Sequence, residues 1–236
     1  MLQHTRTVYL VKYAHKKKLK IKESKTEIKK FNFCTSLDFP PELIVDGFKE
    51  LVKVTKETKL PGIIVTEDLK WEANTNFICS KAYRRMWTIR RMKILNVDPY
   101  IMLDVYKKEI RSILELAVPA WHSGLTKKQS ATIERVQKVA VSIILSDHNT
   151  GLTEYTYDMA LVILDIYPLE VRRFKLCQKF AKQTLKSRHA DMFQINQNQY
   201  NTRLKPEFVI NKSNTERYFK SPINYLTRIL NGEEEF

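Results

Sequence analysis

The pattern that decides the fold is clearest in residues 75–96, TNFICSKAYRRMWTIRRMKILN. Apolar side chains recur there every three or four positions, at Ile78, Ala82, Met86 and Ile89. This spacing places them on one face of an α-helix and leaves the polar residues between them on the other face. We therefore predict an amphipathic helix that buries one side against neighbouring elements.

Three further helices are predicted downstream. Asp98 suits an N-cap and Pro99 suits a first helical turn, so the second helix should run from there to about Leu116. The capping-box sequence Thr126-Lys127-Lys128-Gln129 predicts the start of the third helix, and the fourth should occupy about 168–186. Because a short loop joins the second and third helices, we expect them to pack antiparallel.

The residues before this helical region favour β-structure. The predicted strands cover 26–33, 43–45, 51–54 and 60–65. The Asp46-Gly47 pair between two apolar runs is typical of a hairpin turn, so the middle two strands should pair. The run Leu60–Val65, which is rich in β-branched residues, is predicted to be one buried strand.

The fold class predicted from these patterns is α+β. A small N-terminal β/α piece should occupy 1–71, and a mainly α-helical bundle should follow at 72–186. The last part, 187–236, is polar and rich in Asn and Gln, which predicts a loosely ordered tail with one short helix near Pro222–Leu230.

The charge of the chain favours an anionic partner. Its 41 Lys and Arg residues exceed its 26 Asp and Glu residues, which gives a formal net charge of +15. Residues 1–34 concentrate ten of these cations against Glu23 and Glu27. Such a field attracts a polyanion and releases its condensed counterions, so nucleic acid is the expected partner. A solubilising basic surface is the alternative.

Several classes of site are excluded or disfavoured by composition. The five glycines lie at least fifteen positions apart, which excludes a P-loop and a dinucleotide-binding loop. The three cysteines are widely spaced, as in reduced intracellular proteins, and we expect a nuclear or cytoplasmic location. No apolar run is long enough to predict a membrane span. The carboxylates show no metal-ligand spacing and no Asp-Asp pair, so no metal or cofactor site is predicted.

Arginine and lysine side chains on two predicted helices are the candidate nucleic-acid ligands. They are Lys81, Arg84, Arg85, Arg90, Arg91, Arg172 and Arg173. Arginine binds phosphate bidentately, and aromatic residues such as Tyr83 and Trp87 can stack on bases. A solvated basic face is the alternative for any one pair.

We expect all three tryptophans, at 71, 87 and 121, to be core residues. The His122-Ser123 pair lacks an assignable acid, so a nucleophilic role is not predicted.

An ordered series of motifs over 17–186 resembles a known family. The motifs are Lys59-Leu60-Pro61-Gly62, Asp68-Leu69-Lys70-Trp71, Arg84-Arg85-Met86, Arg111-Ser112-Ile113-Leu114-Glu115, Pro119-Ala120-Trp121, Gly124-Leu125 and Leu169-Glu170-Val171-Arg172-Arg173. In this order they resemble the region that follows the palm in reverse transcriptases of non-LTR retrotransposons, of the LINE or jockey-like kind.

The resemblance implies an RNA-directed DNA polymerase that binds an RNA or DNA template-primer. It makes Leu60 and Gly62 part of the primer grip and 74–146 the thumb, and it makes Lys25 a proton donor in a complete enzyme. Pro61 departs from the pattern, because a proline cannot donate to a sheet ladder.

The aspartates that hold magnesium in the family, together with the fingers, palm and endonuclease, are expected upstream of residue 1. We therefore expect this chain to bind template-primer without polymerising. The alternatives are a protein-interaction module, a remnant without function and, least favoured, an independent enzyme.

Overall fold

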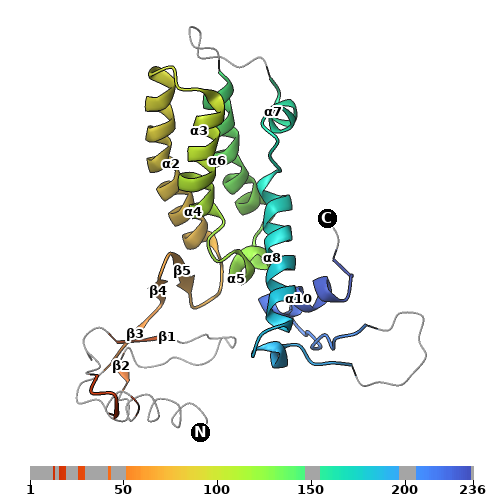
Figure 1. Cartoon of the computed structure of the whole chain (residues 1–236). Helices are drawn as coiled ribbons and strands as arrows, with labels where there is room; N and C mark the ends of the chain where they lie inside the picture. The colour runs from red at the N-terminus through yellow and green to blue at the C-terminus, as the bar shows by residue number, and fades with distance from the viewer. Residues whose placement is uncertain are drawn as a thin grey trace. The chain divides into compact units, whose positions relative to one another are not determined.

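The computed structural model describes residues 52–146, 155–196 and 206–234, with short stretches at 13, 16–19, 26–29 and 42–43. It divides into two compact units, residues 1–70 and 71–236 (Figure 1). The first contains short strands, and the second is almost entirely helical. The predicted α+β class with a helical body is therefore confirmed.

Within the residues that the structure describes, the first unit contains two small sheets. In one, β1 (Glu27–Lys29) pairs parallel with β3 (Val52–Thr55), and β2 (Glu42–Leu43) pairs antiparallel with β3. The predicted pairing of the second and third strands is thus present. The turn expected at Asp46-Gly47 lies outside the described residues.

The prediction of one buried strand at 60–65 is wrong, because this segment turns back on itself. β4 (Glu57–Leu60) and β5 (Ile63–Thr66) form an antiparallel hairpin in which Leu60 lies opposite Ile63. Pro61 and Gly62 make the two-residue turn, and Gly62 has a φ of 92°, which glycine adopts without a steric penalty. Pro61 is therefore not required to donate to the ladder.

Three helical segments form the core of the second unit: α2 (Glu72–Ile94), the segment that begins with α3 (Pro99–Val105), and α6 (Lys127–Leu145). α2 and α6 run in the same direction, because Lys93 Nζ donates to the Ile144 carbonyl at 3.1 Å near their C-terminal ends. Figure 1 shows α3 descending between them, so the predicted antiparallel packing of the second and third helices is confirmed. Fully buried side chains fill the space between these helices.

The predicted starts of the second and third helices are confirmed. The Asp98 side chain accepts from the Tyr100 amide at 2.8 Å, and Pro99 opens α3. Thr126 and Gln129 form the reciprocal capping box of α6. The second helix is less regular than predicted: after α3 it continues as a π-helical turn over Tyr106–Arg111 and ends in α4 (Ser112–Leu114).

The C-terminal half of the unit packs around α8 (Leu169–Leu185), which matches the fourth predicted helix. α8 contacts α6, α5 (Val118–Trp121) and α10 (Pro222–Leu230). Between α6 and α8 lies α7 (Tyr157–Ile163), which the sequence pattern did not predict.

The part of the tail at 206–234 is more ordered than its polar composition predicts. The helix expected near Pro222–Leu230 is present as α10, and its residues Leu226 and Ile229 are buried. Asn231 also closes the segment on itself, because its side chain exchanges two hydrogen bonds with the Phe208 backbone, at 2.9 and 3.0 Å. Buried apolar area and satisfied backbone groups therefore hold this stretch in place.

Two of the three tryptophans are core residues, as predicted. Trp121 is fully buried and its indole donates to the Leu116 carbonyl at 2.9 Å. Trp71 is 8% exposed and lies against Gly124. Among the described helices, none has the length and apolar character needed to cross a membrane.

Candidate nucleic-acid interface

The outward side of α2 carries two arginines on either side of a tryptophan. We call this the arginine face; its members are Arg84, Trp87 and Arg91, all exposed. They follow one another at steps of three and four residues, so they lie one above the other along the helix. The buried side chains of Ala82, Met86 and Ile89 occupy the opposite side of the same helix.

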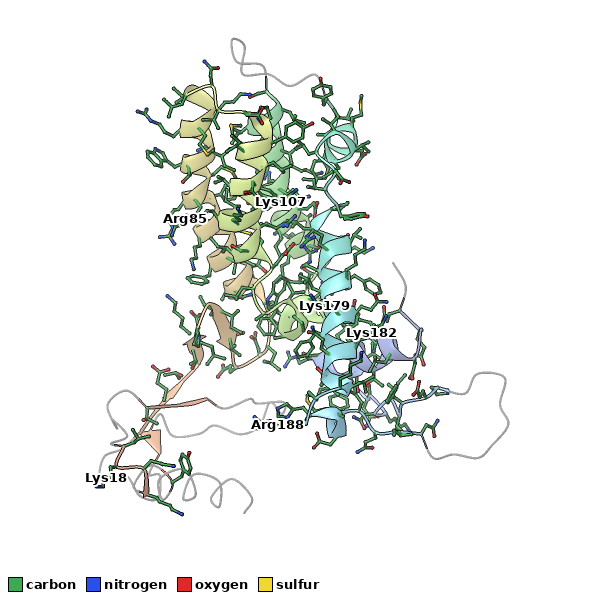
Figure 2. All side chains as sticks on the ribbon, in the orientation of Figure 1. Lys18, Arg85, Lys107, Lys179, Lys182 and Arg188 are labelled. Carbon is green, nitrogen blue, oxygen red and sulfur yellow. The ribbon has the colours of Figure 1, made fainter. Side chains whose placement is uncertain are left out.

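The other predicted cations of α2 lie at the two edges of this face. At about 100° of rotation per residue, Lys81 and Arg85 fall on one edge and Arg90 falls on the other, beside Tyr83. Arg85 reaches Glu109 at 3.8 Å, but both side chains are more than half exposed, so the ion pair is weak. Figure 2 shows Arg85 directed away from the helical bundle.

The prediction that Trp87 is a core residue is wrong. Its side chain is 67% exposed, because it stands about 140° around the helix from Ala82. The exposed indole lies between two guanidinium groups along the helix. This arrangement fits the aromatic platforms on which proteins stack nucleic-acid bases.

The arginine face carries little opposing charge. Glu72, in the first turn, is the one acidic residue of α2. Within the described residues, no ion pair engages Arg84 or Arg91. Both guanidinium groups therefore remain available to an external anion.

Arg172 is not a free phosphate ligand, because it is already paired. Its guanidinium binds the Glu115 carboxylate through two nitrogens, of which Nη2 lies 2.9 Å from Oε2. Arg111 Nε lies 3.6 Å from the same carboxylate. Hydrogen bonding to Glu115 raises the pKa of Arg172. This cluster joins the end of α4 to α8 and has a structural role.

Arg173 is a core residue, which removes it from the candidate set. It is 1% exposed and lies in the buried stripe of α8. Nη2 donates to Ser130 Oγ at 2.6 Å and Nε donates to His122 Nδ1 at 3.4 Å, while Nη1 has no partner among the described residues. A phosphate could reach this guanidinium only if the helices separated.

His122 serves as a hydrogen-bond acceptor for Arg173. Burial, followed by the positive charge of Arg173, lowers the pKa of His122 to about 4. The ring is therefore neutral at physiological pH, with Nδ1 unprotonated. The neighbouring Ser123 Oγ is buried without a partner among the described residues. His122 is oriented by an arginine and not by a carboxylate, so the pair lacks the arrangement that activates a serine.

The remaining predicted site residues lie in the first unit. Leu60 is 45% exposed at the end of β4, and Gly62 forms the hairpin turn. Lys25 lies outside the described residues, as does most of the basic segment 1–34. In the described ranges, no three His, Cys, Asp or Glu side chains gather to hold a metal ion.

The sequence analysis missed a second row of cations, on α8 and at Lys186, the residue that caps its C-terminus. Lys175, Lys179, Lys182 and Lys186 are all exposed. Their spacing of four, three and four residues is the signal that could have identified them, because it places single lysines on one face of a helix. The search for arginine pairs overlooked it.

Comparison of the chain with known protein families, with curated proteins and with solved structures found no match. The residues and their geometry define a helical unit with two exposed basic faces.

Proposed function

We propose that the arginine face of α2 binds the phosphate backbone of a template-primer nucleic acid. We further propose that the chain is the primer-grip and thumb-like part of a non-LTR retrotransposon reverse transcriptase. The observation that carries the binding proposal is the exposure of Arg84, Trp87 and Arg91 on one side of a helix whose other side is buried. The ordered motifs over 17–186 support the assignment to the reverse transcriptases.

The spacing of the two arginines suits a nucleic-acid strand. Seven residues of α-helix separate Arg84 from Arg91 by about 10 Å along the axis. Phosphates of one duplex strand follow one another every 3.4 Å along the helix axis, so this distance covers about three of them. Each guanidinium can grip a phosphate through two parallel N–H bonds, and Trp87 can stack on a base or pack on a sugar between them.

Binding of this kind positions the duplex and carries no sequence information. In a complete polymerase it would hold the primer end near carboxylates supplied by other residues. The chain itself is proposed to bind without extending a primer.

The proposal is tested by reversing the charge of the arginine face. Arg84→Glu/Arg91→Glu should weaken binding of a fluorescent template-primer duplex at least tenfold, measured by anisotropy. It should also lower the salt dependence of log K by about 2, since two phosphate contacts are lost. Lys127→Glu/Lys128→Glu makes the same charge change in the exposed first turn of α6. Equal binding by both variants would rule out the arginine face.

The protein-interaction alternative is favoured by a different observation. Ile94, Leu95, Tyr100 and Ile101 are all more than half exposed around the connection between α2 and α3. Apolar residues gathered in this way often mark protein contacts. Concentration-dependent association in light scattering, combined with no affinity for the duplex, would favour this function over nucleic-acid binding.

A further inference from the structure

We propose that α8 carries a second phosphate-backbone binding surface, separate from the arginine face. We call it the lysine face; its members are Lys175, Lys179, Lys182 and Lys186. It goes beyond the function proposed above, because it would give the chain a second segment of nucleic acid to hold. It rests on α8 alone and does not require that the arginine face binds.

The four lysines share one narrow side of the helix. At about 100° per residue they fall within an arc of about 60°, centred opposite the buried positions Cys177 and Ala181. From the first to the last they extend about 16 Å along the helix axis. Gln178 and Gln183 lie beside them, and together these side chains line a shallow surface depression of about 280 Å³. The surface is therefore a continuous strip of ammonium and amide donors.

No carboxylate neutralises this strip among the described residues. The acidic residue of α8, Glu170, stands in the first turn, five positions before Lys175. None of the ion pairs in the described ranges includes a member of the lysine face. Lys175 Nζ instead lies 3.6 Å from the centre of the Tyr167 ring. Like charges three and four residues apart destabilise a helix, so a bound anion would relieve a standing repulsion.

The chemistry of the strip fits a nucleic-acid backbone better than other anions. Ammonium groups on flexible stems make point-charge contacts that need no fixed geometry, which suits a repeating phosphate chain read without regard to sequence. A strip of about 16 Å spans a length of duplex over which one strand carries about five phosphates. An anionic membrane surface would favour large apolar side chains beside the lysines, whereas the depression is lined by Lys and Gln alone.

The lysine face and the arginine face belong to different sides of the second unit. α2 and α8 lie on opposite sides of α3 and α6, and α6 contacts both (Figure 1). Figure 2 places Arg85 at the α2 edge and Lys179 and Lys182 on α8, well apart within the same unit. A short straight duplex along α2 therefore does not reach the lysine face, and two duplexes can bind at once.

The inference is tested with the full chain and a 12-base-pair duplex at low salt, where the number of duplexes bound per chain is measured by titration calorimetry. We expect the natural sequence to bind at least two duplexes, Lys179→Glu/Lys182→Glu and Arg84→Glu/Arg91→Glu each to bind one fewer, and the combined variant to bind two fewer. Lys127→Glu/Lys128→Glu should bind as many as the natural sequence. The lysine face would be overturned if the natural sequence bound one duplex and Lys179→Glu/Lys182→Glu bound the same number. The arginine face would then be tested separately by Arg84→Glu/Arg91→Glu.

Two other probes identify a different partner. Polyglutamate stands for an acidic protein, and vesicles that contain phosphatidylserine stand for a membrane. If either binds through the lysine face while the duplex does not, the inference is wrong. Folding of Lys179→Glu/Lys182→Glu is checked by thermal melting, because Lys182 lies in the last turn of α8, where a negative charge is unfavourable. Lys179→Gln/Lys182→Gln repeats the binding test without introducing negative charge.

Discussion

At the scale of single residues, two neighbours in the sequence have different roles. Arg172 and Arg173 were predicted together as phosphate ligands, yet one is paired with Glu115 at the edge of α8 and the other is buried. Adjacent helical residues point about 100° apart, so a pair of arginines cannot share one environment. The sequence pattern predicts the helix, but it gave no sign that an arginine occupies the apolar stripe beside Cys177.

Burying Arg173 constrains the residues around it. An unpaired buried charge is costly, and Arg173 has no carboxylate partner among its described hydrogen bonds. It relies on Ser130 Oγ and on the lone pair of His122 Nδ1. The ring of His122 also lies edge-on to Tyr225 of α10, with centroids 5.5 Å apart. Protonation of His122 would remove the acceptor and place a second positive charge beside the first.

We therefore predict that stability falls as His122 becomes protonated. The pKa of His122 is about 4 in the folded chain against an ordinary value of 6.5, so the unfolded chain binds the proton more readily. The contribution of neutral His122 to the free energy of unfolding is fully present above pH 6.5. It is lost as the pH falls toward 4, and the loss amounts to about 3 kcal/mol at most. Urea unfolding at pH 7, 5.5 and 4.5 measures it.

The control for this prediction is His122→Asn, which keeps an acceptor for Arg173 and cannot titrate. Carboxylates also titrate in this range, so the informative quantity is the difference between the two proteins. The natural chain should lose more of its free energy of unfolding between pH 7 and 4.5 than the variant loses. Parallel losses in both proteins would mean that His122 keeps an ordinary pKa.

At the scale of elements, local signals located the helices well. α3, α6, α8 and α10 begin within a residue or two of their predicted starts, because caps, prolines and apolar spacing are properties of the sequence itself. The hairpin of β4 and β5 was missed because Leu60 and the apolar run after Gly62 were interpreted as one strand, although the chain turns at Pro61 and Gly62 between them. Trp87 was missed because a tryptophan is usually buried, and only its position relative to Ala82 shows that it faces solvent.

The packing of the loop before α6 against the start of α2 leads to a second prediction. A β-carbon at Gly124 would lie 2.5 Å from Trp71 Nε1 and 2.6 Å from Cδ1. Trp71 is itself buried and cannot move aside cheaply. Gly124→Ala should therefore lower the free energy of unfolding by about 1–3 kcal/mol, measured by urea denaturation.

Trp71→Ala tests the cause of that loss. It removes both ring atoms that the new methyl group would meet, so Gly124→Ala should cost less in the Trp71→Ala background than in the natural one. Gly232→Ala is the control for backbone strain, because Gly232 has a φ of 73° but no atom within 4 Å of a β-carbon. Equal costs of Gly124→Ala in both backgrounds would contradict the predicted clash.

At the scale of the whole molecule, the proposed binding surfaces follow from the charge of the chain. The net charge of +15 and the arginines of α2 were apparent in the sequence, so the arginines of the arginine face could be predicted. The lysine face was not predicted. Which cations stay exposed depends on packing against α5, α6 and α10, which residue types alone do not specify. Both the arginine face and the lysine face lie on the second unit, which contains its own buried core.

We therefore predict that residues 71–236 fold and bind without the first unit. Their buried side chains pack against one another, with Trp71 as the first, so removal of 1–70 should leave the melting temperature of the helical unit within a few degrees. Duplex binding should persist through both faces, with a lower salt dependence if the basic segment 1–34 also contacts phosphate. Circular dichroism and the calorimetric titration described above measure both properties.

Residues 71–205 provide the matched comparison, because this shorter chain also lacks α10. Tyr225, Leu226 and Ile229 of α10 are buried, and α10 packs against α8 and α5, so its removal exposes the side of α8 that holds Cys177. This second chain should melt at a clearly lower temperature and bind a hydrophobic dye, although it keeps every member of both basic faces. If 71–236 instead behaves like 71–205, the helical unit depends on the first seventy residues, and its binding surfaces must be tested only in the full chain.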